Sequence, residues 1–210
     1  MGTAERKERE KQQRKLDIVE ASEKVFLTKG FENTTMDDIA EQAELSKGTL
    51  YLYFKSKEEL YSEIIKKGEK ILTDLFKEAV NTNENGLCKV KNIGEAFIKF
   101  YNEYQEFHEA ILLGHSKTHI QDDEKKCEDC KDGKVESNQV FVEAIEEGIK
   151  DGSIRSDVDP LKTSLLLWAQ SMGVMQMIQH QAIFLKETCN TSSEELLEHF
   201  FIYTYNALKA

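Results

Sequence analysis

Apolar residues recur at the spacing of amphipathic helices over most of this 210-residue chain. The first stripe includes Leu16, Val19, Val25 and Phe26, and Gly30 follows where a helix is expected to end. Similar stripes cover five later segments, residues 57–81, 97–119, 140–151, 160–178 and 192–208. The pattern predicts an all-α protein of about nine helices.

The turn composition supports this fold class. Pro160 is the only proline and glycines number 11, whereas β-sandwiches and barrels need many Pro and Gly turns. No apolar run approaches the ~20 residues of a membrane span, and no leader with a cleavage site is visible. We therefore expect a cytoplasmic protein with no membrane partner.

Three residues that favour helix N-termini follow one another closely between the first stripe and the second. Thr35, Ser46 and Ser56 predict helix starts there, so two short helices over residues 36–43 and 47–53 precede a long one. Such a pair of short helices joined by a tight turn is a helix-turn-helix. Ile39, Ala40 and Leu50 are placed to pack the pair together.

The second short helix carries groups that suit DNA. Lys47, Thr49, Tyr51 and Tyr53 offer hydroxyl and ammonium groups that can bind phosphate oxygens or base edges. Gly48 leaves the backbone N–H groups at the helix start open to a phosphate. The Lys57 ammonium stands at the start of the next helix, where we expect it to hold another phosphate. If the tyrosines instead filled a core beside Leu50 and Phe54, this helix would have no polar face.

This region resembles the TetR family of bacterial transcriptional regulators. Residues 34–60 read TTMDDIAEQAELSKGTLYLYFKSKEEL, and Gly30 and Phe31 precede them in the same pattern. The resemblance implies a DNA-binding domain of three helices over residues 1–57 and a helical effector-binding and dimerisation domain over residues 58–210. One departure is Glu44, where the family usually has a glycine in the turn. The residues expected to contact DNA are Thr35, Ser46, Lys47, Gly48, Thr49, Tyr51, Tyr53 and Lys57.

The charge distribution agrees with DNA binding at one end only. The chain has a net charge of −11, which by itself argues against a polyanionic partner. Residues 1–57 hold 11 basic and 11 acidic side chains, so the entire excess of acid lies in residues 58–210. The N-terminal end is therefore the part fit to approach double-stranded DNA.

One short recognition helix contacts too few base pairs for useful specificity, so we expect a homodimer on a palindromic operator. The candidate dimer surface is the pair of C-terminal helices, around residues 165–178 and 196–208. The same apolar residues could also form an intrachain core, and one helix can serve both purposes.

The C-terminal part shows no catalytic set, neither a nucleophile elbow nor a phosphate-binding glycine loop, so we expect no enzyme and no required cofactor. The resemblance implies instead a pocket for a small, largely apolar effector whose binding releases a repressor from DNA. An aromatic and methionine-rich stripe is also typical of plain core. The candidate effector contacts are Phe97, Phe100, Tyr101, Tyr104, Phe107, Ile111, Phe141, Trp168, Met172 and Met175.

A group of histidines and cysteines leaves an alternative open. His115, His119, Cys127 and Cys130 combine a pair of imidazoles one turn apart with a CxxC pair, a donor set suited to zinc. The thiols alone could also form a redox switch, or all four could be exposed residues without a site. The alternative function is thus a metal- or thiol-responsive regulator, or a helical metal-binding enzyme.

Overall fold

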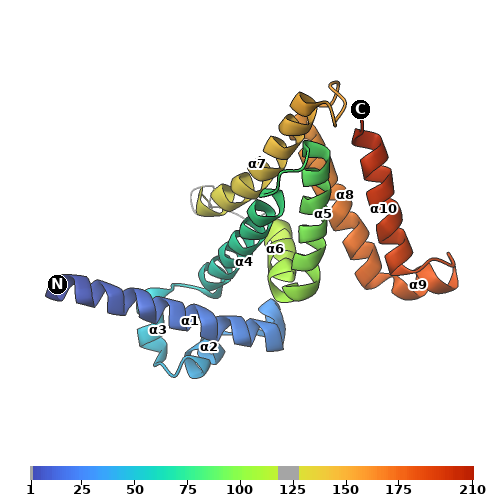
Figure 1. The fold of residues 1–210 in the computed structure, drawn as a ribbon. Coiled ribbons are helices and arrows are strands. Elements are labelled where there is room, and N and C mark those ends of the chain that lie inside the picture. The colour runs from blue at the N-terminus through green and yellow to red at the C-terminus, as the bar shows by residue number, and fades with distance from the viewer. Residues whose placement is uncertain (1, 118–127) are drawn as a thin grey trace. The chain divides into compact units, whose positions relative to one another are not determined.

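The structure, a computed structural model, describes residues 2–117 and 128–210, with side chains described for residues 2, 5–112 and 136–210. Helices account for most of this part of the chain, and no strand occurs in it (Figure 1). The all-α prediction is therefore confirmed. The ten helices are α1 (Thr3–Asn33), α2 (Met36–Gln42), α3 (Lys47–Tyr53), α4 (Lys57–Val80), α5 (Gly86–Glu103), α6 (Gln105–Lys117), α7 (Glu128–Asp151), α8 (Pro160–His180), α9 (Ala182–Glu187) and α10 (Ser193–Leu208).

The helices group into two compact units. The N-terminal unit contains Met1–Gly68 and Glu106–Cys130, and the C-terminal unit contains Glu69–Gln105 and Lys131–Ala210. The boundary thus falls inside α4. The domain boundary expected after residue 57 stays a prediction.

Local signals explain the start of each helix in the N-terminal unit. The Thr35 hydroxyl accepts a hydrogen bond from the Asp38 N–H, and Asp38 in turn accepts one from the Thr35 N–H. Ser46 accepts from the Thr49 N–H at 3.1 Å, which caps α3. The predicted caps of α2 and α3 are confirmed, and they fix the two helices on either side of a short turn.

Asp38 is held ionised by this arrangement. Hydrogen bonds from Lys29 and Thr35 lower the pKa of Asp38 to about 2. The unfolded chain binds a proton more readily, so the cap's contribution is present above about pH 4 and is lost as the pH falls towards 2.

The core of this unit includes the apolar residues that helical spacing predicted to pack between the helices. Ile18, Ile39, Leu50 and Phe54 have no exposed surface, and Ala40 is 4% exposed. A small side chain at position 40 lets α2 approach its neighbours closely. The predicted packing of the helix-turn-helix is confirmed.

Four features of the helices differ from the sequence prediction. Helix α1 begins at Thr3, ahead of the first predicted stripe, and α7 begins at Glu128, ahead of the stripe predicted over residues 140–151. Tyr104 (φ −130°, ψ 46°) separates α5 from α6, and the short α9 was not expected, so the described residues form ten helices rather than nine. Helix continuation in a polar segment leaves no apolar stripe to detect, which explains the first two differences.

The turn between α2 and α3 retains the backbone conformation of a glycine. Glu44 has φ 54°, and the Leu45 N–H donates to the Ala40 carbonyl across the turn. A side chain with a Cβ is unfavourable there by about 1 kcal/mol. Glutamate in place of the family's usual glycine therefore adds strain to the turn but does not change its geometry.

We expect Glu44→Gly to raise the free energy of unfolding by up to about 1 kcal/mol, because glycine relieves the strain at positive φ. The matched control is Glu41→Gly, an exposed position with helical backbone in α2. There the same change should lower stability by about 1 kcal/mol. Urea denaturation of both variants measures this, and a loss of stability in Glu44→Gly would contradict the strain.

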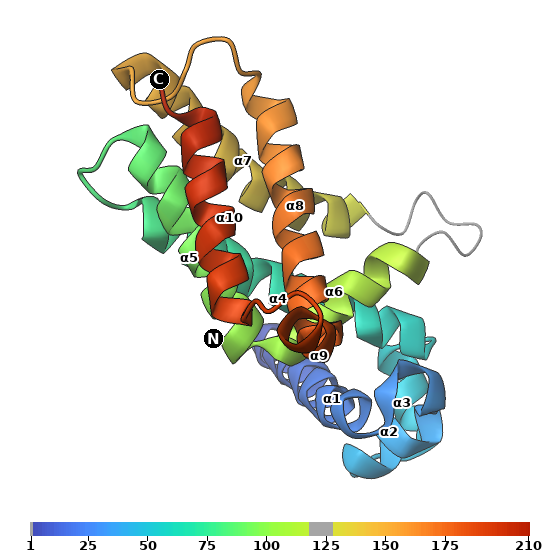
Figure 2. The ribbon, with the colours of Figure 1, turned by 90° about the vertical axis from the view of Figure 1, so that its right-hand side faces the viewer.

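The C-terminal unit packs long helices around an apolar core. Figures 1 and 2 show α8 and α10 side by side, with α9 at one end of both. At the start of α5, Gly86 lies against α7, where an added Cβ would stand only 2.0 Å from the Gly148 nitrogen. Asp151 accepts a hydrogen bond from the Gly86 N–H at 2.8 Å, which joins the same two helices. Among the described residues, no helix is long and apolar enough to cross a membrane.

Candidate DNA interface and effector cavity

The exposed face of α3 carries most of the predicted DNA contacts. Ser46, Lys47 and Gly48 are exposed, Tyr51 keeps 44% of its surface, and Thr49 and Tyr53 are half-buried. Leu50 and the capping residue Phe54 point into the core with no exposed surface. The helix therefore buries one apolar face and exposes a second face that carries these polar groups, as the sequence indicated. Thr35, at the start of α2, is also exposed.

Gly48 has no packing role in this structure. A Cβ added there would meet nothing nearer than the Ser46 Oγ at 4.0 Å, and its φ is not in the left-handed region. The fold would thus accept a larger residue, so the open backbone is consistent with the close approach of a phosphate.

Lys47 already has an anionic partner. Its ammonium lies 2.7 Å from a carboxylate oxygen of Asp37, and this hydrogen bond raises the pKa of Lys47. Both side chains are more than half exposed, so the pair is worth little in water. A phosphate can therefore replace Asp37 at low energetic cost.

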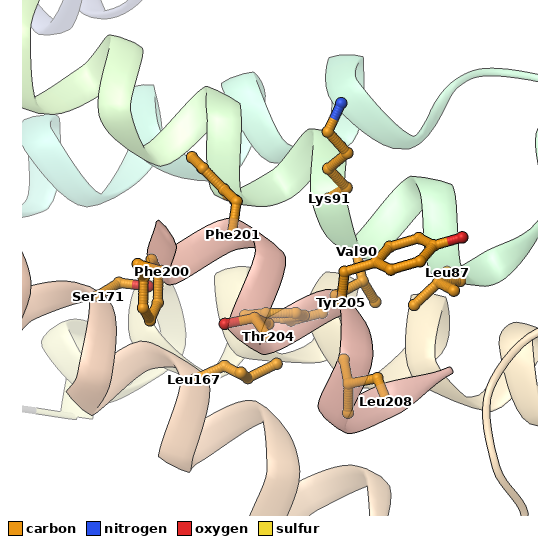
Figure 3. Close-up of a pocket in the computed structure, with 12 residues that line it drawn as sticks. Leu87, Val90, Lys91, Leu167, Ser171, Phe200, Phe201, Thr204, Tyr205 and Leu208 are labelled. Carbon is orange, nitrogen blue, oxygen red and sulfur yellow. The ribbon is translucent and has the colours of Figure 1, made fainter. Parts of the chain in front are cut away.

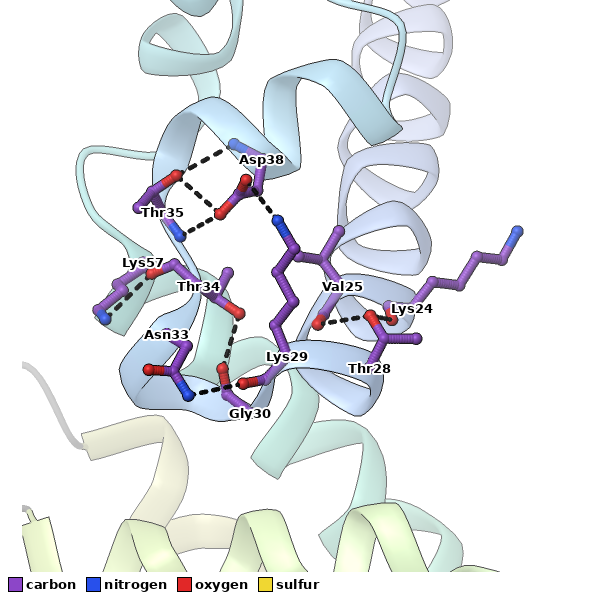
Figure 4. Close-up of polar contacts among 10 residues, drawn as sticks. All are labelled: Lys24, Val25, Thr28, Lys29, Gly30, Asn33, Thr34, Thr35, Asp38 and Lys57. Carbon is purple, nitrogen blue, oxygen red and sulfur yellow. Dashed lines mark hydrogen bonds and ion pairs between the residues drawn. The ribbon is translucent and has the colours of Figure 1, made fainter.

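Lys57 is placed differently from the sequence expectation. Its Nζ donates to the carbonyl oxygens of Phe31 at 2.9 Å, Glu32 at 3.3 Å and Thr34 at 3.1 Å. It also lies 4.5 Å from the centre of the Phe31 ring. Figure 4 shows the side chain reaching the end of α1 beside Thr34. The ammonium thus serves as a cap for α1, and its predicted phosphate contact stays a prediction.

The sequence missed one exposed residue on α3. Leu52 is 82% exposed and lies between the two tyrosines. An apolar side chain on a DNA-facing helix can contact the methyl group of thymine. A helical projection of residues 47–53 shows that Leu52 falls opposite the buried Leu50, so the spacing did contain the signal.

A small cavity lies in the C-terminal unit between α5, α7, α8 and α10 (Figure 3). Its volume is about 30 Å³, room for little more than a water molecule. Phe201 packs so closely on α5 that a Cβ at Gly94 would lie 2.6 Å from its ring. Most of the lining is apolar: Leu87, Val90, Lys91, Gly94, Phe141, Leu167, Ser171, Phe200, Phe201, Thr204, Tyr205 and Leu208.

Polar groups at the cavity are few. Thr204 and Ser171 contribute hydroxyl groups from α10 and α8, whereas the Lys91 ammonium points away (Figure 3) and lies 3.1 Å from a carboxylate oxygen of Glu95. The Thr204 Oγ1 is buried and has no hydrogen-bond partner within the described part of the chain. Leaving a buried hydroxyl unsatisfied costs about 1–3 kcal/mol, so this atom is suited to bind a polar group.

Of the ten predicted effector contacts, only Phe141 lines this cavity. The Phe97 ring packs edge-on against Trp168 with 5.4 Å between centres, Phe100 stacks on Tyr104 at 5.8 Å, and the Tyr101 hydroxyl donates to the Met175 carbonyl at 3.3 Å. These residues and the half-buried Met172 belong to the C-terminal unit. Phe107 and Ile111 belong to the N-terminal unit, where they pack at Gly68. The ten residues are thus divided between the two units, and their effector contacts stay predictions.

His108 is the buried titratable group next to Phe107. It is 3% exposed, and burial lowers its pKa to about 4. The imidazole is therefore neutral at pH 7 and adds no charge to this apolar region.

The predicted metal group cannot be assigned to a site. His119 and Cys127 lie outside the described residues, as do the side chains of His115 and Cys130. Within the described part of the chain, no three His, Cys, Asp or Glu side chains gather as a metal group would.

The fold and the exposed face of α3 define a helix-turn-helix DNA-binding protein. The family model "Bacterial regulatory proteins, tetR family" matches residues 18–64, which run from α1 into α4. The matched residues therefore form a DNA-binding domain of the tetR type, and the enzyme alternative is not favoured.

Individual relatives agree with this assignment. The transcriptional repressor KstR2 of Mycolicibacterium smegmatis is 24% identical over 146 residues, 70% of each chain. The HTH-type transcriptional regulator YfiR of Bacillus subtilis is 48% identical over 58 residues, 28% of each chain. The solved structure of the ketosteroid transcriptional regulator KstR2 of Mycobacterium tuberculosis matches with a TM-score of 0.65 at 17% identity, covering 94% of this chain and 95% of that one.

Proposed function

We propose that this protein is a ligand-responsive repressor that binds a palindromic operator as a homodimer and acts in the cytoplasm, where that DNA is found. The observation that carries the proposal is the exposed face of α3. Its polar side chains are not used in packing the core, so they are available to bind DNA. Thr35, Lys47, Thr49, Tyr51 and Tyr53 supply the contacts to bases and phosphates. The relatives named KstR2 are repressors, which favours repression here.

The exposed apolar residues of the last three helices support a dimer. Leu161, Leu165 and Leu166 on α8 are 54%, 53% and 61% exposed, and Ile202 and Tyr203 on α10 are 51% and 61% exposed. Ile183 and Phe184 extend the same character onto α9. Apolar groups gathered on neighbouring helices mark an interaction surface. A second copy of this chain is the partner that also supplies the second recognition helix.

The cavity near Thr204 is the proposed start of an effector site. Its apolar lining favours a largely apolar ligand with one polar group that meets the Thr204 hydroxyl. One relative is a ketosteroid regulator by title, which is compatible with such a ligand. The present cavity is too small for an effector, so the effector must bind a second conformation in which it is larger. Release of DNA then requires that this conformation fit the operator less well.

Selection of bound duplexes from random DNA tests the DNA part of the proposal. Wild-type protein should enrich an inverted repeat, and Tyr51→Ala should bind that repeat about 10-fold or more weakly, because a contact on the exposed face is lost. Tyr51→Phe is the matched control. It removes only the hydroxyl group, so it separates the contribution of the hydroxyl to DNA affinity from that of the ring. Unchanged enrichment and affinity in Tyr51→Ala would contradict the proposed interface.

A further inference from the structure

Helix α1 begins well before the helix-turn-helix. It spans 31 residues, whereas the family match starts at residue 18. Side chains 5–14 are all exposed, so this stretch makes no core. Figure 1 shows the N-terminal part of α1 continuing past α3 within the same unit. A polar helix with no packing partner calls for another explanation of its charges.

The charges of this stretch are sorted by face. Residues 3–15 hold six basic and three acidic side chains. Lys7, Lys11, Arg14 and Lys15 follow the i, i+4, i+7, i+8 spacing of a single helix face. We call these four residues the basic stripe. Arg6 and Arg9 project to the opposite side.

The acidic side chains do not neutralise the basic stripe. Glu10 pairs with Arg6 at 2.7 Å, Glu8 accepts from the Gln12 amide at 3.1 Å, and Glu5 accepts from the Gly2 N–H. Within the described residues, neither an ion pair nor a hydrogen bond engages the side chains of Lys7, Lys11 or Arg14. Three cations on one face therefore remain available to an anionic partner.

Lys15 fixes the direction of the basic stripe relative to the recognition helix. Its ammonium lies 5.2 Å from the centre of the ring of Phe54, the residue that ends α3. The stripe therefore runs away from the C-terminal end of α3 along one side of α1. From Lys7 to Lys15 it spans about 12 Å, the rise of about three to four base pairs.

We propose that the basic stripe binds the phosphates of duplex DNA beside the sequence that α3 reads. This inference rests on the proposed function and extends its footprint by a contact that carries no sequence information. Lysine and arginine on an exposed helix suit this role because they neutralise phosphates and release counterions. The stripe thereby strengthens binding of any duplex in the same proportion.

The test compares two double variants that remove the same charge from opposite faces. Lys7→Gln/Lys11→Gln removes two cations from the basic stripe, and Arg6→Gln/Arg9→Gln removes two from the other side of the same turns. Glutamine keeps the helix propensity, and circular dichroism verifies the helix content. Lys7→Arg/Lys11→Arg keeps the charge and serves as the rescue. Affinity is measured against a random-sequence duplex and the selected inverted repeat over a series of salt concentrations.

The stripe variant should bind both duplexes about 10-fold more weakly at low salt, and its salt slope should fall by about 2 per protomer. The opposite-face variant should stay within about twofold of wild type, and the arginine variant should bind like wild type. Equal affinities in the two glutamine variants would overturn the inference while leaving the helix-turn-helix intact. If wild-type protein bound neither duplex, the proposed function itself would fail.

Discussion

Replacing Lys57 by methionine should lower the free energy of unfolding by about 3 kcal/mol. Methionine keeps the length and the apolar stem but deletes the ammonium that donates to the carbonyls of Phe31, Glu32 and Thr34. Hydrogen bonds from a charged donor are worth about 1.5–3 kcal/mol, and a cation at a helix C-terminus adds up to about 1 kcal/mol. The Phe31 ring loses its cation as well. Urea denaturation followed by circular dichroism measures the change.

The matched control is Lys55→Met, two residues earlier. The Lys55 side chain is exposed and makes no polar contact with other described residues, so its loss should change stability by less than about 0.5 kcal/mol. Both variants remove one positive charge from the segment that follows α3, so their affinities for DNA can be compared directly. If Lys57→Met unfolded at the same urea concentration as wild type while its salt slope alone fell by about 1, the ammonium would serve DNA rather than α1.

Lys57 shows where sequence reasoning about the site reached its limit. The sequence placed a lysine at a helix start near the recognition helix, and a phosphate was the nearest partner that its chemistry suggested. Its actual partners are backbone carbonyls more than twenty residues earlier, and no side-chain pattern encodes a carbonyl. Thr35 and Ser46 were predictable because a cap and its partner are three residues apart.

The core was likewise predictable from local sequence spacing, whereas the cavity was not. The inward positions Ile39, Leu50 and Phe54 follow from helical spacing, because each helix has one face to bury. The cavity depends on how α10 rests on α5, where Phe201 approaches Gly94. These two residues are about one hundred positions apart in the sequence. Helical spacing could therefore identify candidate aromatic residues, but it could not show which of them come into contact. Only Phe141 belongs to both the predicted set and the lining.

The basic stripe was not predicted for a related reason. Residues 3–15 carry charges of both signs and no apolar stripe that would indicate a helix, so the sequence alone does not predict a helix there. Once α1 extends through them, the helical period sorts the same charges onto two faces. A modest net charge can thus hide a strongly cationic side.

Leu166→Glu should turn the protein into a monomer and weaken its binding to the selected inverted repeat by about 100-fold or more. Leu166 is 61% exposed on α8, within the apolar surface proposed for the dimer. In the proposed dimer a carboxylate there would be buried against apolar side chains of the second copy, which is strongly unfavourable. Loss of the dimer removes the second recognition helix, and the two half-sites then no longer bind together. Sedimentation and operator titration measure the two effects.

Leu27→Glu is the matched control, because Leu27 is a leucine of similar exposure, 54%, on α1 in the N-terminal unit. The same substitution there should leave the sedimentation of the protein unchanged, so any monomer formed by Leu166→Glu cannot come from added charge alone. Thermal unfolding must show that Leu166→Glu still folds, which its exposed position favours. A folded Leu166→Glu dimer with wild-type operator affinity would place the dimer surface elsewhere. A folded monomer that kept this affinity would show that a single recognition helix is sufficient for operator binding. We do not expect that result, because the seven-residue helix α3 has too few outward side chains for sequence-specific binding on its own.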